Sequence, residues 1–118
     1  MTNDALRALL REARTVAVVG LSPKPERPSH GVARYLQRAG YRIVPVNPGH
    51  DEILGERSYR TLADAARDHA IDIVDVFRRS EHAGAVVDEA ARARAEGAGI
   101  SIVMDRCLAI DHRRLLGD

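Results

Sequence analysis

Residues 16–36 read VAVVGLSPKPERPSHGVARYL, and this stretch decides the fold class. The mostly apolar run Thr15 to Val19 meets Gly20, which is typical of a strand buried on both faces of a sheet. Residues 21–29 contain three prolines and are predicted to form a loop. Residues 30–39 are predicted to form a helix that ends near Gly40. This order predicts the first unit of a parallel α/β sheet, with the strand in a central position.

The rest of the chain continues the alternation of strands and helices. Apolar residues at helical spacing predict a short N-terminal helix, capped by Asn3 or Asp4, whose buried face carries Leu6, Leu9, Leu10 and Ala13. A second short helix is predicted over residues 61–69, with Leu62, Ala65 and Ala66 facing inward. The other predicted elements are strands at 42–46, 71–77 and 100–104, a helix from Ser80 to about residue 96, and one helical turn near 112–115.

Alternating strands and helices imply βαβ units, and right-handed crossovers leave few arrangements open. We therefore predict a single domain over residues 1–118, with a Rossmann-like three-layer α/β/α fold and a parallel sheet of about four to five strands. In such sheets ligands bind at the carboxyl ends of the strands, where the strand order reverses. Residues 20–31, 47–48 and 77–79 are expected to share that edge.

Composition excludes several classes of protein. Lys and Arg number 18 against 17 Asp and Glu, so the chain lacks the basic field of a dedicated nucleic-acid binder. Trp is absent and aromatic residues make up 3%, which removes stacking platforms for single strands. The single cysteine, Cys107, cannot form an internal disulfide, and no metal-ligand spacing is present. With no secretory signal or membrane-spanning segment in the sequence, we expect a cytoplasmic protein.

The loop after the first strand has the composition of an anion site. Gly20 allows a close approach of the backbone to a ligand, and the helix start at His30 and Gly31 is expected to present free N–H groups. Hydroxyl groups and positive charge would come from Ser22, Ser29, Lys24 and Arg27. On the pattern alone, a glycine turn with a solvated basic loop remains an alternative.

The residues at the end of the second predicted strand argue against NAD as the bound cofactor. Dinucleotide enzymes that use NAD usually place an acid there to bind the ribose hydroxyls. Here the strand ends in Val46, Asn47 and Pro48, and the nearest acids, Asp51 and Glu52, lie beyond a glycine. Asn47 and Pro48 are also explained as a turn that stops the strand.

Three blocks of sequence resemble a known family. They are residues 16–62, residues 72–82 (DIVDVFRRSEH) and residues 103–117 (VMDRCLAIDHRRLLG). Together they resemble the small stand-alone coenzyme A binding proteins, which are similar to the N-terminal domain of the succinyl-CoA synthetase alpha subunit. The resemblance covers nearly the whole chain and implies a Rossmann-type fold that binds coenzyme A or an acyl-CoA across the carboxyl ends of the strands.

The resemblance also implies roles for single residues. The phosphates and ribose would be surrounded by Gly20, Ser22, Arg27, Pro28, Ser29 and Gly31. Lys24 and His30 join them as candidates from the same loop and helix start. Asn47 and Pro48 would flank the adenosine, and the far wall would be lined by Val76, Phe77 and Arg78. For Arg78 and Arg79 a solvated surface pair is the alternative.

The chain departs from the family in one respect. Family members carry a further strand and helix between the equivalents of Glu89 and Ala91, whereas this sequence passes from one helix directly to the last strand. Loss of a whole βα unit preserves a parallel sheet but narrows it. We therefore expect a greater tendency to form a homodimer than in the complete family.

Three functions from different classes fit these observations. The favoured one is a non-catalytic carrier or sensor that binds coenzyme A. The alternatives are an NAD(P)- or acyl-CoA-dependent enzyme, and a nucleotide-responsive protein interaction module. Cys107 and His112, with Asp105, could suggest a nucleophile and its base, but nothing in the sequence fixes their geometry and packing explains them better.

Overall fold

The computed structural model describes residues 2–77, 100–104 and 107–117. Four parallel strands form one sheet in the order β2-β1-β5-β6, with bounds Thr15–Val19 (β1), Arg42–Val46 (β2), Ile73–Val76 (β5) and Ser101–Met104 (β6). The described helices are α1 (Asn3–Glu12), α2 (Pro28–Arg38), α3 (Leu62–Asp68) and α5 (Leu108–Leu115). The predicted helix from Ser80 to about residue 96 lies outside the described residues.

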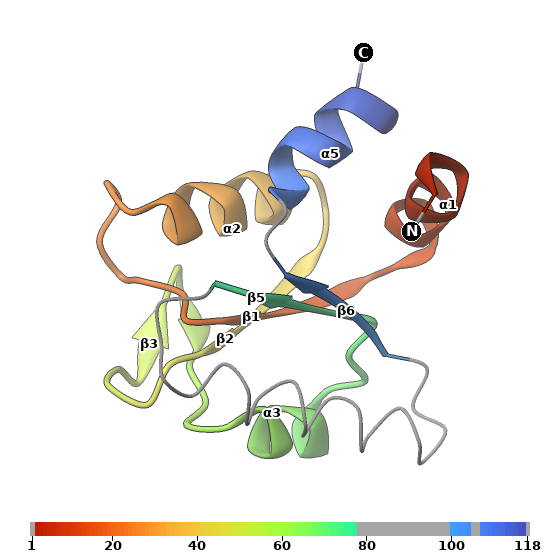
Figure 1. Cartoon of the computed structure of the whole chain (residues 1–118). Helices are drawn as coiled ribbons and strands as arrows, with labels where there is room; N and C mark the ends of the chain where they lie inside the picture. The colour runs from red at the N-terminus through yellow and green to blue at the C-terminus, as the bar shows by residue number, and fades with distance from the viewer. Residues whose placement is uncertain (1, 78–99, 105–106, 118) are drawn as a thin grey trace.

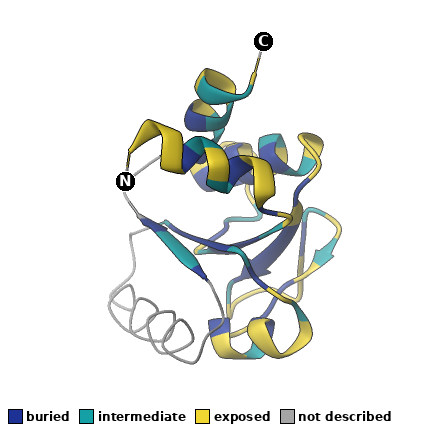
Figure 2. Cartoon of the chain, turned by 90° about the vertical axis from the view of Figure 1, so that its right-hand side faces the viewer, coloured by how far each residue is buried: buried dark blue, intermediate teal, exposed yellow. Residues whose placement is uncertain are grey.

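The elements form three layers (Figure 1). Helices α1, α2 and α5 cover one face of the sheet, and α3 lies on the other. Alternate residues of each strand enter opposite cores, so Val16 and Val18 pack under α1, α2 and α5 while Ala17 packs towards α3. Figure 2 shows the buried strands between helices whose outer faces are exposed. The predicted three-layer α/β/α class is confirmed.

β1 is an interior strand, as predicted. Val16 pairs with Ile43 of β2 on one side and with Ile73 of β5 on the other. Because the strand order reverses at β1, the carboxyl end of this strand faces the crevice where ligands bind in such sheets. β6 pairs directly with β5 and lies at the end of the order of described strands.

Several predicted helix boundaries were wrong. α1 is capped by Thr2, whose hydroxyl accepts a hydrogen bond from the Ala5 N–H at 3.1 Å, and not by Asn3 or Asp4. α2 begins at Pro28 and not at His30, because proline at the first helical position already has a helical φ. The predicted turn at 112–115 is the end of the eight-residue helix α5. Ala66 is exposed, since only Leu62 and Ala65 of α3 face the sheet.

A short hairpin follows β2 and was not predicted. It consists of β3 (Glu52–Ile53) and β4 (Glu56–Arg57), joined by Leu54 and Gly55 with φ angles of 56° and 75°. Positive φ at both central residues defines the tight turn that suits a two-residue hairpin. Ile53 is buried in the core under α2, and the Gln37 side chain donates a hydrogen bond to the Leu54 carbonyl at 3.2 Å. The burial of Ile53 and the hydrogen bond from Gln37 therefore hold the hairpin against α2.

Asp72 and Asp75, two aspartates at β5, differ in their hydrogen bonding. The Asp72 carboxylate accepts hydrogen bonds from the Arg14 and Thr15 N–H groups at 2.9 and 3.0 Å. Asp75 lies between Val18 and Val103 within the sheet and is 1% exposed, and its Oδ2 has no hydrogen-bond partner among the described residues. Burial raises the pKa of the Asp75 carboxyl to about 7. The ionised form is therefore disfavoured in the folded state.

Replacing Asp75 with Asn is expected to stabilise the fold in a pH-dependent way. The unfolded chain ionises this carboxyl above its usual pKa of 3.8, whereas the folded chain holds the proton until about pH 7. The wild type therefore loses stability relative to Asp75→Asn as the pH rises between these values. Urea unfolding should show a gain of roughly 4 kcal/mol at pH 8 and a smaller gain of about 1–2 kcal/mol at pH 5. Asp72→Asn, which weakens two accepted hydrogen bonds, should destabilise the protein; a gain for Asp75→Asn that is independent of pH would contradict the assignment.

Candidate functional site

The site begins where β1 ends. Gly20 has a φ of 85°, and a Cβ atom added there would lie 2.9 Å from the Phe77 carbonyl oxygen. Its N–H donates to the Val46 carbonyl at 3.0 Å, and the Phe77 N–H donates to Val19 at 2.9 Å. The carboxyl ends of β2, β1 and β5 are therefore drawn together at a position that only glycine occupies without strain.

The loop that follows is folded back onto the start of α2. The Ser29 hydroxyl accepts a hydrogen bond from the Ser22 N–H at 3.0 Å, and the Ser22 hydroxyl accepts one from the Lys24 N–H at 3.1 Å. The Arg27 N–H donates to the Lys24 carbonyl at 3.0 Å. Ser29 is buried, so its hydroxyl fixes the loop from inside. The loop is thereby shaped by its own hydrogen bonds.

Asn47 joins this loop to the turn after β2. Its side-chain amide donates to the Leu21 carbonyl at 2.9 Å, and its side-chain oxygen accepts from the Gly49 N–H at 2.9 Å. The Asn47 carbonyl accepts from the Ser58 hydroxyl at 3.1 Å. Both ends of the Asn47 side chain are therefore engaged within the protein, and Asn47 holds the edge of the site in shape.

These segments enclose an open pocket of about 550 Å³, within the usual range for small-molecule sites. Eight of the predicted residues line it: Gly20, Ser22, Lys24, Arg27, Pro28, Ser29, Asn47 and Phe77. Two further lining residues, Pro23 and His50, were missed in the sequence. Pro23 lies in the quoted loop, and His50 follows directly on the turn that was predicted at residues 47–49.

The remaining predicted residues do not line this pocket. His30 is 9% exposed and turned towards the core, and Val76 is buried in the core on the α3 side of the sheet. Gly31 and Pro48 are exposed outside the pocket lining. The N–H groups of His30 and Gly31 both donate to the Arg27 carbonyl, at 3.1 and 3.3 Å, so the expectation that they are free was wrong. Arg78 lies outside the described residues.

The pocket has a positive lining. Lys24 and Arg27 are exposed, and neither side chain has an ion-pair partner among the described residues. His50 adds an imidazole, and none of the described residues that line the pocket is Asp or Glu. A pocket of this size with unneutralised cations at its rim suits an anionic ligand.

Cys107 and His112 do not form a reactive pair in this structure. Cys107 caps α5 and packs against the core. The His112 Nδ1 lies 3.0 Å from the Tyr35 hydroxyl, and the rings of Tyr35 and Tyr41 pack edge-on against it. Burial lowers the pKa of the His112 imidazole. Neither residue lines the pocket, which fits the packing role expected for them. In the described part of the chain, no three His, Cys, Asp or Glu side chains are grouped as metal ligands.

The fold and the pocket define a Rossmann-like α/β domain with a pocket lined by Lys24 and Arg27 at the carboxyl edge of its sheet. The sequence pattern of the family described as CoA binding domain matches residues 14–97. The chain belongs to this family, which binds coenzyme A.

Similar proteins cover almost the whole chain. The uncharacterized protein YneT of Bacillus subtilis is 37% identical over 125 residues, with 91% of each chain covered. A hypothetical protein from Pyrococcus horikoshii is 33% identical with a TM-score of 0.84, covering 99% of this chain and 94% of its own. A protein from Thermus thermophilus is 36% identical with a TM-score of 0.78, covering 98% of this chain and all of its own.

The alignment with YneT bears on the length of the chain. Its 125 positions exceed the 118 residues of the whole chain, so YneT has residues that lack a counterpart here. That the difference is one complete βα unit, and that it favours a homodimer, remain predictions.

Two glycine substitutions should separate the strained position from the permissive one. Gly20→Ala is expected to lower the free energy of unfolding by at least about 2 kcal/mol, because it combines a positive φ with a clash against the Phe77 backbone. Gly31→Ala should raise it by about 0.5–1 kcal/mol, since the residue is helical and a Cβ there meets nothing within 4 Å. Urea unfolding measures both. Equal effects of the two variants would refute the close approach at Gly20.

Proposed function

We propose that this protein binds coenzyme A or an acyl-CoA through the loop after β1, as a non-catalytic cytoplasmic carrier or sensor. The observation that carries the proposal is the positive pocket built by residues 20–29 in a chain of the CoA binding domain family. In the described part of the chain, no helix has the length and apolar character needed to cross a membrane. The ligand would reach the pocket from its open side.

The charged part of the coenzyme would lie over the loop. Lys24 and Arg27 are the side chains whose charge is available to the diphosphate, and the Arg27 guanidinium can bind two oxygens at once. The Ser29 N–H, in the first turn of α2, has no backbone acceptor among the described residues and adds a neutral donor at the same end. The hydroxyls of Ser22 and Ser29 already accept loop N–H groups, so they shape the site.

The structure supports an NAD(P)- or acyl-CoA-dependent enzyme less well than it supports binding of coenzyme A. The residue at the end of β2 is Asn47, and its amide is engaged within the protein, so an NAD ribose would find no acid there. Asp51 faces a different pocket. For an acyl-CoA enzyme, the two candidate groups Cys107 and His112 lie outside the pocket lining. Binding without chemistry is the simplest function for this site.

Calorimetric titration with coenzyme A tests the proposal. We expect saturable binding of micromolar strength, with weaker binding of NAD and NADP. Arg27→Gln should weaken coenzyme A binding by roughly tenfold, because it removes a charge-assisted contact to phosphate. Arg34→Gln is the matched control, since Arg34 is exposed on α2, the helix that Arg27 precedes, but does not line the pocket.

A folded protein that gives no saturable heat with coenzyme A would overturn the proposal. Tighter binding of NAD than of coenzyme A would favour the dinucleotide alternative. If Arg27→Gln and Arg34→Gln weakened binding equally, the effect would come from net charge and the loop would lose its assigned role.

Incubation with acetyl-CoA separates a carrier from an enzyme. We expect the thioester to remain intact at the rate of the protein-free control, because among the described residues no hydrogen bond joins the His50 imidazole to a nucleophile in the pocket, and the hydroxyls of Ser22 and Ser29 are engaged by loop N–H groups. Mass spectrometry of the coenzyme and of the protein measures both hydrolysis and acyl transfer. Loss of the acetyl group that depends on the protein, and that disappears in Cys107→Ser, would contradict the carrier function and restore Cys107 as a nucleophile.

A further inference from the structure

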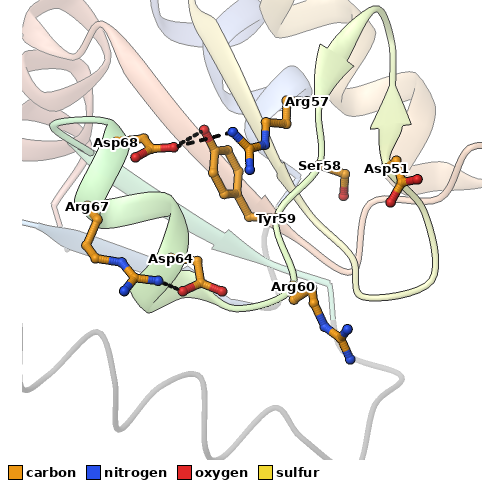
Figure 3. Close-up of a pocket in the computed structure, with 8 residues that line it drawn as sticks. All are labelled: Asp51, Arg57, Ser58, Tyr59, Arg60, Asp64, Arg67 and Asp68. Carbon is orange, nitrogen blue, oxygen red and sulfur yellow. Dashed lines mark hydrogen bonds and ion pairs between the residues drawn. The ribbon is translucent and has the colours of Figure 1, made fainter.

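A second open pocket, of about 700 Å³, lies between the β3–β4 hairpin and α3 (Figure 3). Its lining comes from the turn before β3, from β4 and the segment after it, and from α3. The residues are Asp51, Arg57, Ser58, Tyr59, Arg60, Asp64, Arg67 and Asp68. Three arginines and three aspartates thus face one hollow, so the pairing among them decides what it can bind.

Two of the three arginines are neutralised within the protein. Arg67 forms an ion pair with Asp64 on the same helix. Arg57 lies 3.9 Å from the Asp68 carboxylate and packs over the Tyr59 ring at 5.1 Å. The Tyr59 hydroxyl also donates to Asp68 at 2.8 Å, so the Asp68 carboxylate is doubly engaged.

Arg60 is the cation that remains. Its guanidinium has no carboxylate within ion-pair distance among the described residues. In Figure 3 it extends away from both Asp51 and Asp64. A cation that lines a pocket without a partner is available to an anionic group of a ligand.

The backbone holds Arg60 next to the turn that follows β2. Tyr59, the residue before it, continues the sheet beyond β2: its N–H donates to Pro45 at 3.0 Å and its carbonyl accepts from Asn47 at 2.9 Å. The Ser58 N–H donates to the Asp51 carbonyl at 2.8 Å. His50 lines the first pocket and Asp51 lines the second, so one turn separates the two hollows.

We infer that Arg60 binds the 3′-phosphate of coenzyme A, an inference that rests on the proposed function. Coenzyme A carries two anionic groups, the diphosphate and the 3′-phosphate, on different positions of one ribose. Lys24 and Arg27 serve the first group on one side of the turn, and Arg60 serves the second on the other side.

The test compares coenzyme A with dephospho-CoA, which lacks only the 3′-phosphate, by calorimetry at one salt concentration. The wild type should bind coenzyme A roughly tenfold more tightly than dephospho-CoA, the size of one charge-assisted contact. In Arg60→Gln that preference should fall to about one, while the affinity for dephospho-CoA stays unchanged. Arg60 is exposed, so the variant should unfold at the same urea concentration as the wild type.

Arg38→Gln is the control for net charge, because Arg38 is exposed in the last turn of α2 and lines neither pocket. It should keep the full preference for coenzyme A. Equal binding of the two ligands by the wild type, or a preference that survives in Arg60→Gln, would overturn the inference and leave coenzyme A binding itself intact. A folded wild type that binds neither ligand would remove the proposed function, and this inference with it.

Discussion

The contact on which the site depends is the approach of Gly20 to the backbone of Phe77. The Phe77 carbonyl oxygen occupies the space that a side chain at Gly20 would need, and the positive φ of Gly20 turns the chain away from the sheet at that point. The loop therefore leaves β1 directly over the end of β5. Asn47 then ties the third strand end to the loop through its bond to Leu21. Three strand ends and one loop form a single rim because one residue lacks a side chain.

The parts of the fold that could be predicted from the sequence are those set by apolar burial. β1 and β2 begin and end at the predicted residues because uninterrupted apolar runs are bounded by glycine, proline and asparagine. The hairpin was missed since its strands have two residues each and its turn uses Leu54 where asparagine or aspartate is usual. The start of α2 was placed two residues late, and this shift misassigned the N–H groups of His30 and Gly31.

The sequence predicted eight of the residues that line the pocket, but it did not separate those that shape the loop from those that are free to bind a ligand. Ser22, Ser29 and Asn47 have polar groups that are engaged by the protein itself. Lys24 and Arg27 line the same pocket with their charges unpaired among the described residues. A sequence pattern weighs both kinds of residue equally, because it does not show where each hydrogen bond goes. The missed residue His50 also lines the pocket, and the path of the turn after Asn47 brings it there.

The protonation state of Asp75, the buried acid of β5, is compatible with a positively lined pocket. Asp75 precedes Phe77 by two residues, so along an extended strand it lies roughly 7 Å below the rim. An ionised carboxylate at that depth would oppose the attraction of Lys24 and Arg27 for a phosphate through a medium of low dielectric constant. Burial raises the pKa of Asp75 to about 7, which favours the neutral form below that pH. The burial of Asp75 therefore destabilises the folded state at high pH, and it also lowers the negative charge beneath a pocket that is suited to an anion.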